Sequence, residues 1–128
     1  MCEGCRPARP LLRIATAFAG AAAVDLESVE DDLCALASCA LAARCASPAE
    51  QLSTVATAMD PFALSEDQLG FDDLLLHRVL ARWTGAPLVL CAVAAEAGAR
   101  AGLELTIAGD GTRHVLVHPE CAELAWDP

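Results

Sequence analysis

Apolar residues along this chain recur mostly at helical spacing, and the stretch that organises the pattern runs from Phe71 to Gly102. Its first half carries apolar side chains three and four residues apart, which predicts a helix that Gly85 ends. Pro87 can open a second helix, because proline gives up no hydrogen bond at the first helical position. Residues 88–95 are apolar on nearly every face, so we expect this second helix to be buried and to end before Gly102. The apolar positions of the first helix are Leu75, Leu76, Val79, Leu80 and Trp83.

Three helices are expected before this stretch, and two of them have recognisable caps. Asp25 or Ser28 can cap the second helix, since a short side chain with an oxygen accepts a hydrogen bond from an unpaired backbone N–H. Ser47 can cap the third, and Pro48 then stands at its first helical position. The expected helices span residues 10–22, 25–45 and 47–59.

Apolar and polar residues alternate after Gly102, which predicts strands. Leu103–Ala108 and His114–His118 are expected to form a hairpin around a glycine-rich turn, and Ala122–Trp126 a third strand. The segment Pro61–Gly70 is interpreted as a loop whose apolar side chains fold onto the core, namely Phe62, Leu64 and Leu69. The pattern predicts an α+β fold, with N-terminal helices plus a buried central helix packed on a small antiparallel sheet.

Length and composition indicate a single domain. A chain of 128 residues is long enough for its own core, which we place over residues 10–128 after a flexible tail at residues 1–9. The hydrophobic fraction is 55% but aromatic residues make up only 4%, which favours helices packed through small side chains.

The mean hydropathy of +0.43 is high. The longest apolar runs nevertheless reach only about half of the ~20 residues that a membrane helix needs.

The net charge of the chain excludes some classes of binding partner. Eight basic residues face 18 acidic ones, giving a formal net charge of −10, which repels nucleic acid and anionic membranes. The expected partner is therefore a protein or peptide, while the oligomeric state stays open.

Residues 6–24 have the outline of a secretory signal, but alanine dominates the apolar part and Arg13 interrupts it. We expect a cytoplasmic protein.

Seven cysteines are many for this length, and an odd number leaves at least one unpaired. In a cytoplasmic chain cysteines are mostly reduced and serve as small apolar residues. Cys34, Cys39 and Cys45 lie on one expected helix, where Cys34 and Cys45 are about three turns apart, too far to form a disulfide with each other. We expect these three side chains in the core.

Several short motifs resemble a known family. V-L-A-R-W-T-G-A-P-L at residues 79–88 is followed by an apolar helix, by A-R-A-G-L at 99–103 and by R-H-V-L-V at 113–117. R-P-L-L-R-I-A at 9–15 and the closing W-D-P at 126–128 extend the likeness. Together these motifs resemble the N-terminal domain of the SirB1 family, a branch of the transglutaminase-like superfamily. The resemblance implies a papain-like fold over most of the chain.

The resemblance also implies where catalytic residues would lie. Active members of the superfamily place a nucleophilic cysteine at the start of the buried helix, then a histidine and an aspartate on the following strands. His114 and Asp127 occupy the histidine and aspartate positions. Pro87 stands at the cysteine position, as proline generally does in SirB1-like members. The resemblance therefore favours a non-catalytic domain that acts as a binding or regulatory module.

A thiol enzyme is the alternative. Cys91 lies four residues after Pro87, on the same helix face one turn on, and with His114 and Asp127 it would make a peptidase or acyltransferase. A thiol one turn inside an apolar helix is desolvated, however, which raises its pKa and opposes a nucleophilic role. The alternative interpretation is purely structural: Cys91 is a buried cysteine, and the neighbouring histidine is retained from an ancestor of the family.

A zinc-stabilised module is the third possibility. Cys2 and Cys5 form one pair with ligand-like spacing and His118 and Cys121 form another, so together they supply ligands suited to tetrahedral zinc. The pairs lie at opposite ends of the chain, and the gap between them is not that of a recognised zinc finger. Without zinc, the first pair belongs to a tail and Cys121 to a turn. No other cofactor is expected.

Overall fold

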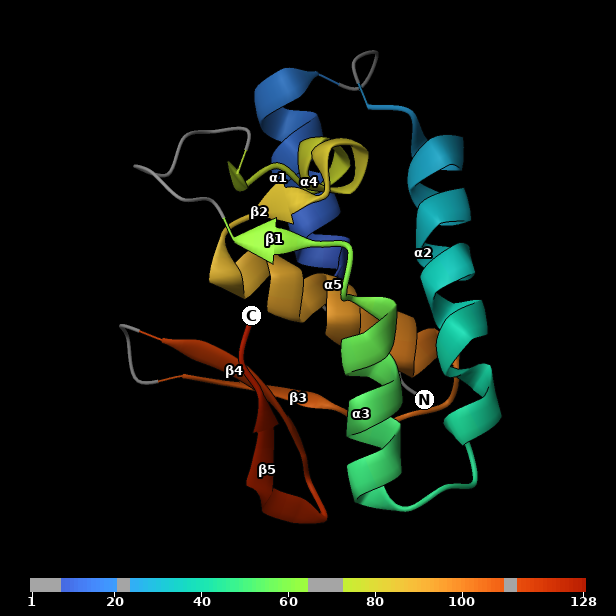
Figure 1. The fold of residues 1–128 in the computed structure, drawn as a ribbon. Helices are drawn as coiled ribbons and strands as arrows, with labels where there is room; N and C mark the ends of the chain where they lie inside the picture. The colour runs from blue at the N-terminus through green and yellow to red at the C-terminus, as the bar shows by residue number, and fades with distance from the viewer. Residues whose placement is uncertain (1–7, 21–23, 65–72, 110–112) are drawn as a thin grey trace.

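One buried helix, Pro87–Arg100, runs through the middle of the molecule, with other helices around it and a sheet along one side (Figure 1). The structure, a computed structural model, describes residues 8–20, 24–64, 73–109 and 113–128, without the side chains of residues 8 and 121–123. The elements in chain order are α1 (Ala8–Ala19), α2 (Leu26–Ala40), the 3₁₀ turn η3 (Leu41–Ala43), α3 (Pro48–Ala58), β1 (Ala63–Leu64), α4 (Leu76–Arg82), β2 (Thr84–Gly85), α5 (Pro87–Arg100), β3 (Thr106–Gly109), β4 (His114–His118) and β5 (Cys121–Trp126).

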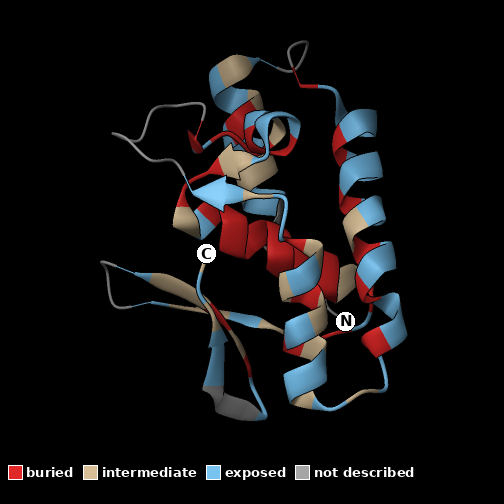
Figure 2. Ribbon diagram, viewed as in Figure 1, coloured by how far each residue is buried: buried red, intermediate tan, exposed pale blue. Residues whose placement is uncertain are grey.

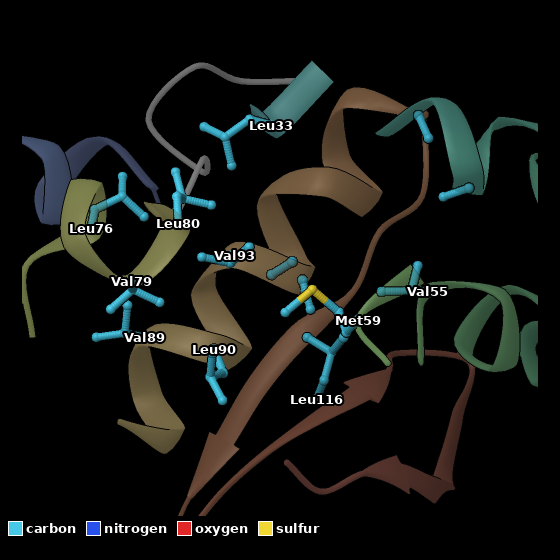
Figure 3. Close-up of a cluster of buried hydrophobic side chains, with 14 of the residues drawn as sticks. Leu33, Val55, Met59, Leu76, Val79, Leu80, Val89, Leu90, Val93 and Leu116 are labelled. Carbon is cyan, nitrogen blue, oxygen red and sulfur yellow. The ribbon is translucent and has the colours of Figure 1, made fainter. Parts of the chain in front are cut away.

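The burial of α5 follows from its composition. Every residue from Val89 to Gly98 is buried (Figure 2), because helices α1–α4 and strands β3 and β4 contact this helix. Leu90 and Val93 of α5 belong to one apolar cluster with Met59 and Leu116 (Figure 3). The predicted buried central helix, opened by a proline, is confirmed. Neither α5 nor any other helix among the described residues is long and apolar enough to cross a membrane.

Helix α5 ends in a Schellman motif. Gly102 has a φ of 88°, its N–H donates to the Ala99 carbonyl at 3.1 Å, and the N–H of Leu103 donates to the Gly98 carbonyl at 2.8 Å. These bonds satisfy carbonyls at the helix end and tie Leu103 to the helix. The strand that we expected from Leu103 therefore begins only at Thr106.

Strand β4 is the centre of an antiparallel sheet with the order β3-β4-β5. Thr106 lies opposite Val117 in the first pair of strands, and Leu116 lies opposite Trp126 in the second. Leu116 is fully buried, in the cluster that includes α5, so this face of β4 is turned toward the helices. The predicted antiparallel sheet, and with it the α+β fold, is confirmed. The turn at 110–112 lies outside the described residues.

The predicted helix caps are confirmed, whereas two predicted helix ends are too late. The Asp25 carboxylate accepts from the Ser28 N–H at 3.1 Å, and the Ser47 hydroxyl accepts from the Glu50 N–H at 3.3 Å. Helix α1 ends at Ala19 and not at 22, because Gly20 leaves the helix with a φ of 87°. Helix α2 ends at Ala40 and continues only as the 3₁₀ turn to Ala43, not to Cys45.

The end of α4 differs from the prediction. Trp83, not Gly85, ends this helix, and it adopts the left-handed conformation with a φ of 56°. Trp83 is 54% exposed, unlike the other apolar residues at helical spacing in this segment, which are buried. Gly85 instead belongs to β2, where a Cβ would lie 2.8 Å from the Val79 side chain. The glycine therefore serves close packing and not helix termination. Phe71, the expected start, lies outside the described residues.

The segment after α3 is not only a loop. Residues Ala63 and Leu64 form β1, which pairs in parallel with β2, and the Ala63 N–H donates to the Trp83 carbonyl at 2.9 Å. Phe62 packs against the core as predicted. Leu64 is 40% exposed, so its predicted burial is wrong, while Leu69 lies outside the described residues. A two-residue pairing across a long sequence gap leaves no alternating pattern that a sequence could reveal.

The prediction that the three cysteines in and after α2 lie in the core is wrong. Cys34, Cys39 and Cys45 are all exposed free thiols. The buried stripe of α2 is made by Val29, Leu33, Ala37 and Ala40, and the two cysteines of this helix fall beside that stripe. Alanine and valine fill the helix interface in their place. Cys91, by contrast, is buried as expected.

Candidate functional site

The predicted catalytic residues come from α5 and from the two strands nearest the C-terminus. Pro87 occupies the first position of α5 and Cys91 lies one turn further along. His114 is the first residue of β4, which packs on α5, and Asp127 directly follows β5. The fold therefore places His114 at the start of the strand beside the helix, and Asp127 just after the end of the neighbouring strand.

The Cys91 thiol is shielded from solvent. Its exposed fraction is 0%, and burial raises the pKa of Cys91 from its usual 9.0 to about 12, with a further rise from the negative charge of Asp127. A thiol with so high a pKa is almost entirely protonated at neutral pH, and the thiolate is the nucleophilic form. The environment of Cys91 thus opposes the role that a triad would require of it.

The raised pKa of Cys91 predicts a loss of stability in alkali. The unfolded thiol ionises above pH 9.0, whereas the folded thiol stays protonated to about pH 12. Between these values the unfolded state binds fewer protons, so the free energy of unfolding should fall by up to about 1.4 kcal/mol per pH unit. Urea unfolding between pH 8.5 and 10.5 should show this extra slope in the parent and in Cys39→Ala, which removes an exposed thiol. Cys91→Ala should lack the slope, and an unchanged slope would contradict the assignment.

The His114 ring lies on the helix-facing side of the sheet. Side chains alternate along a strand, so His114 shares a face with the buried Leu116. Gly109 lies opposite His114 in β3, and a Cβ on Gly109 would come within 2.9 Å of the ring carbon Cδ2. The Arg113 carbonyl oxygen would lie closer still, at 2.7 Å, so the glycine makes room for the backbone as well as for the half-buried ring.

Asp127 pairs with an arginine. Asp127 directly follows Trp126, which lies opposite Leu116 at the end of β5. There the Asp127 carboxylate accepts a hydrogen bond from the Arg113 guanidinium. In the part of the chain that the structure describes, no hydrogen bond joins Asp127 to the His114 ring. The carboxylate that would orient the imidazole in a triad is therefore engaged elsewhere.

The zinc hypothesis falls largely on residues that the structure does not describe. Cys2 and Cys5 lie outside the described residues, as does the side chain of Cys121. His118 is buried, its Nε2 lies 2.8 Å from the Gln51 amide oxygen, and its Nδ1 accepts from the Glu120 N–H at 3.0 Å. These partners assign the proton to Nε2 and use both ring nitrogens. Within the described ranges no three His, Cys, Asp or Glu side chains gather as a metal site. The zinc site stays a prediction.

A buried ion-pair network was missed in the sequence. Glu96 of α5 is 1% exposed and accepts from Arg100 Nε at 2.8 Å, while the other Arg100 nitrogens donate to both oxygens of Glu30 in α2 at 2.7 and 2.9 Å. These hydrogen bonds raise the pKa of Arg100 above its usual range. The signal was present, since a glutamate and an arginine four residues apart in an otherwise apolar helix face each other.

A family model matches most of the chain. Residues 25–128 match the model described as the transglutaminase-like superfamily. The matched range begins at the cap of α2, so it excludes α1 and the motif at 9–15. Neither a curated protein nor a solved structure matches the chain.

Proposed function

The chain belongs to the transglutaminase-like superfamily, and on that basis we propose that it is a non-catalytic, SirB1-type member that acts as a binding or regulatory module. The observation that carries the proposal is Pro87 at the first position of α5. A helix N-terminus is the place where a thiol gains nucleophilicity from a lowered pKa. Proline has no nucleophilic side chain. The helix start is therefore retained in the fold but cannot supply the attacking thiol.

The surroundings of the other candidate residues support the same proposal. Cys91 is buried with a raised pKa, and Asp127 binds Arg113 in place of orienting His114. A thiol, an imidazole and a carboxylate must act together in acyl transfer, because each one activates or orients the next. Burial of Cys91 weakens its activation by His114, and the contact of Asp127 with Arg113 separately weakens the orientation of His114.

The SirB1-type assignment rests on the motifs around the helix. The residues at 79–88 form the end of α4, β2 and the start of α5, and those at 99–103 form the Schellman end of α5. The motif at 113–117 carries His114 into β4. These motifs bracket the central helix, so the likeness concerns the part of the fold that positions the site.

The proposed class of partner follows from the net charge. With a formal net charge of −10 the chain repels nucleic acid and anionic lipid, which leaves a protein or peptide as the proposed partner. A regulatory role in the cytoplasm is consistent with free cysteines on the surface, three of which are exposed among the described residues.

Turnover measurements test the proposal. The purified chain should show no hydrolysis or transamidation of glutamine peptides, and no cleavage of activated esters, beyond the rate of His114→Ala or Cys91→Ala. An acylating thiol probe should label the exposed cysteines at rates that do not depend on His114. Turnover of any of these substrates that disappears in both variants, while their folded state is retained by circular dichroism, would establish the thiol enzyme instead.

A further inference from the structure

An apolar groove of about 250 Å³ lies between α2, the end of α3 and α4. None of the candidate catalytic residues lines it. Its walls combine aliphatic and aromatic side chains with one thiol and one carboxylate, chiefly Asp32, Leu36, Cys39, Phe62, Leu80 and Trp83. Docking of an amphipathic helix into an apolar surface groove is one of the recurring modes of protein recognition.

Two aromatic rings form one end of the groove, and the backbone holds them in place. Phe62 and Trp83 stack with ring centroids 6.1 Å apart and an angle of 29° between the rings. Each ring directly precedes a strand of the β1–β2 pair, and the Ala63 N–H donates to the Trp83 carbonyl at 2.9 Å. Trp83 is nevertheless 54% exposed. An exposed tryptophan that is already fixed loses little conformational entropy on binding, which favours its use as an anchor.

The size of the groove favours protein side chains over a cofactor. Its 250 Å³ fall below the roughly 300–1,000 Å³ typical of small-molecule sites. A groove of this size instead accepts a few apolar side chains of a larger partner. The site is therefore suited to the apolar face of an amphipathic segment.

Charge around the groove specifies the partner further. Asp32 lines the groove, Asp31 precedes it on α2, Asp60 precedes the wall residue Pro61, and all three carboxylates are exposed. The nearby arginine at the end of α4, Arg82, is engaged with Asp73 at 3.7 Å. A second copy of this chain, with its own net charge of −10, would be repelled, as would any acidic partner.

We propose that this groove docks a basic amphipathic segment of a partner protein. Apolar side chains of the segment pack on Leu36 and the stacked aromatic pair, and flanking arginine or lysine side chains face Asp32 and its neighbours. This inference rests on the proposed role as a binding module and names the surface and the class of partner for it.

Cys39 provides a direct measurement, because it is an exposed thiol inside the groove. The probe is a cysteine-free helical peptide with leucine and phenylalanine at positions i, i+3, i+4 and i+7 and arginine elsewhere. Saturating peptide should slow the reaction of Cys39 with a maleimide by about tenfold or more. Cys34 and Cys45 are exposed outside the groove lining and should react at unchanged rates, which makes them controls within the same molecule.

Two matched changes separate charge from apolar contact. A peptide with glutamate in place of every arginine, and a peptide with serine in place of every apolar residue, should each leave Cys39 unprotected. Asp32→Arg, a change at an exposed position, should weaken protection by the basic peptide and strengthen protection by the acidic one. Protection that is equal for both charge types, or that covers all three thiols, would overturn the proposal, and so would no protection at all.

The remaining outcomes also decide the question. Slow Cys39 labelling without peptide, together with a dimer in sedimentation, would assign the groove to a second copy and refute a basic partner. Turnover that requires His114 would refute the non-catalytic role and leave the groove result intact. Absence of turnover together with an unprotected Cys39 would refute the groove alone.

Discussion

Replacing Arg100 with leucine should lower the free energy of unfolding by about 3–5 kcal/mol. Arg100 joins two carboxylates, Glu96 at 2.8 Å on its own helix and Glu30 at 2.7 Å on α2. Its side chain is 15% exposed and that of Glu96 only 2%, so the substitution removes the Arg100 guanidinium from beside a buried negative charge. Breaking one side of a buried pair costs far more than the pair contributes, because the remaining charge stays desolvated.

A double substitution provides the control for this prediction. Arg100→Leu with Glu96→Leu removes both charges, so the double variant should be more stable in urea than Arg100→Leu alone. Glu30→Ala should cost only about 1 kcal/mol or less, since the Glu30 side chain is 54% exposed and solvent screens its contribution. If Arg100→Leu unfolds at the same urea concentration as the parent, the network does not have the role assigned to it.

Leu116→Ala should lower the free energy of unfolding by about 2–5 kcal/mol. Leu116 is 0% exposed and lies at the centre of the sheet, opposite Trp126 of β5. Its side chain belongs to the same core cluster as Leu90 and Val93 of α5 (Figure 3). Removing it leaves a cavity between the sheet and the helix that the surrounding side chains fill only in part.

Leu124→Ala is the matched control, since Leu124 lies in the adjacent strand and is 39% exposed. Its loss should change the free energy of unfolding by no more than about 0.5 kcal/mol. Both variants are measured by urea denaturation at pH 7, where Cys91 is protonated in either state. Equal effects for the two leucines would show that the sheet does not rely on Leu116 for its attachment to α5.

Helix α5 and the antiparallel sheet are held together by packing contacts that do not depend on catalytic chemistry. Helix α5 is held by burial on all sides and by its Schellman end, and the sheet is attached through Leu116. None of these contacts involves a nucleophile. The fold of this superfamily member is therefore held by contacts that do not depend on which residue stands at the start of the helix, where this chain has Pro87.

The local signals in the sequence were sufficient where each depends on neighbouring residues alone. The caps at Asp25 and Ser47, the proline start and glycine end of α5, and its burial all follow from side-chain chemistry and backbone preferences within a few positions. Strands β4 and β5 were predicted for the same reason, since alternation is a local pattern.

The tertiary structure decided what depends on residues far apart in the chain. The short β1–β2 pair, the exposed face of α2 with its cysteines, and the Asp127 to Arg113 contact each arise from which surfaces meet. The sequence alone determined an α+β domain with a buried proline-started helix and no cysteine at its start. Only the packing of that helix against its neighbours decided that Cys91 is desolvated, because burial is a property of all the surrounding elements together.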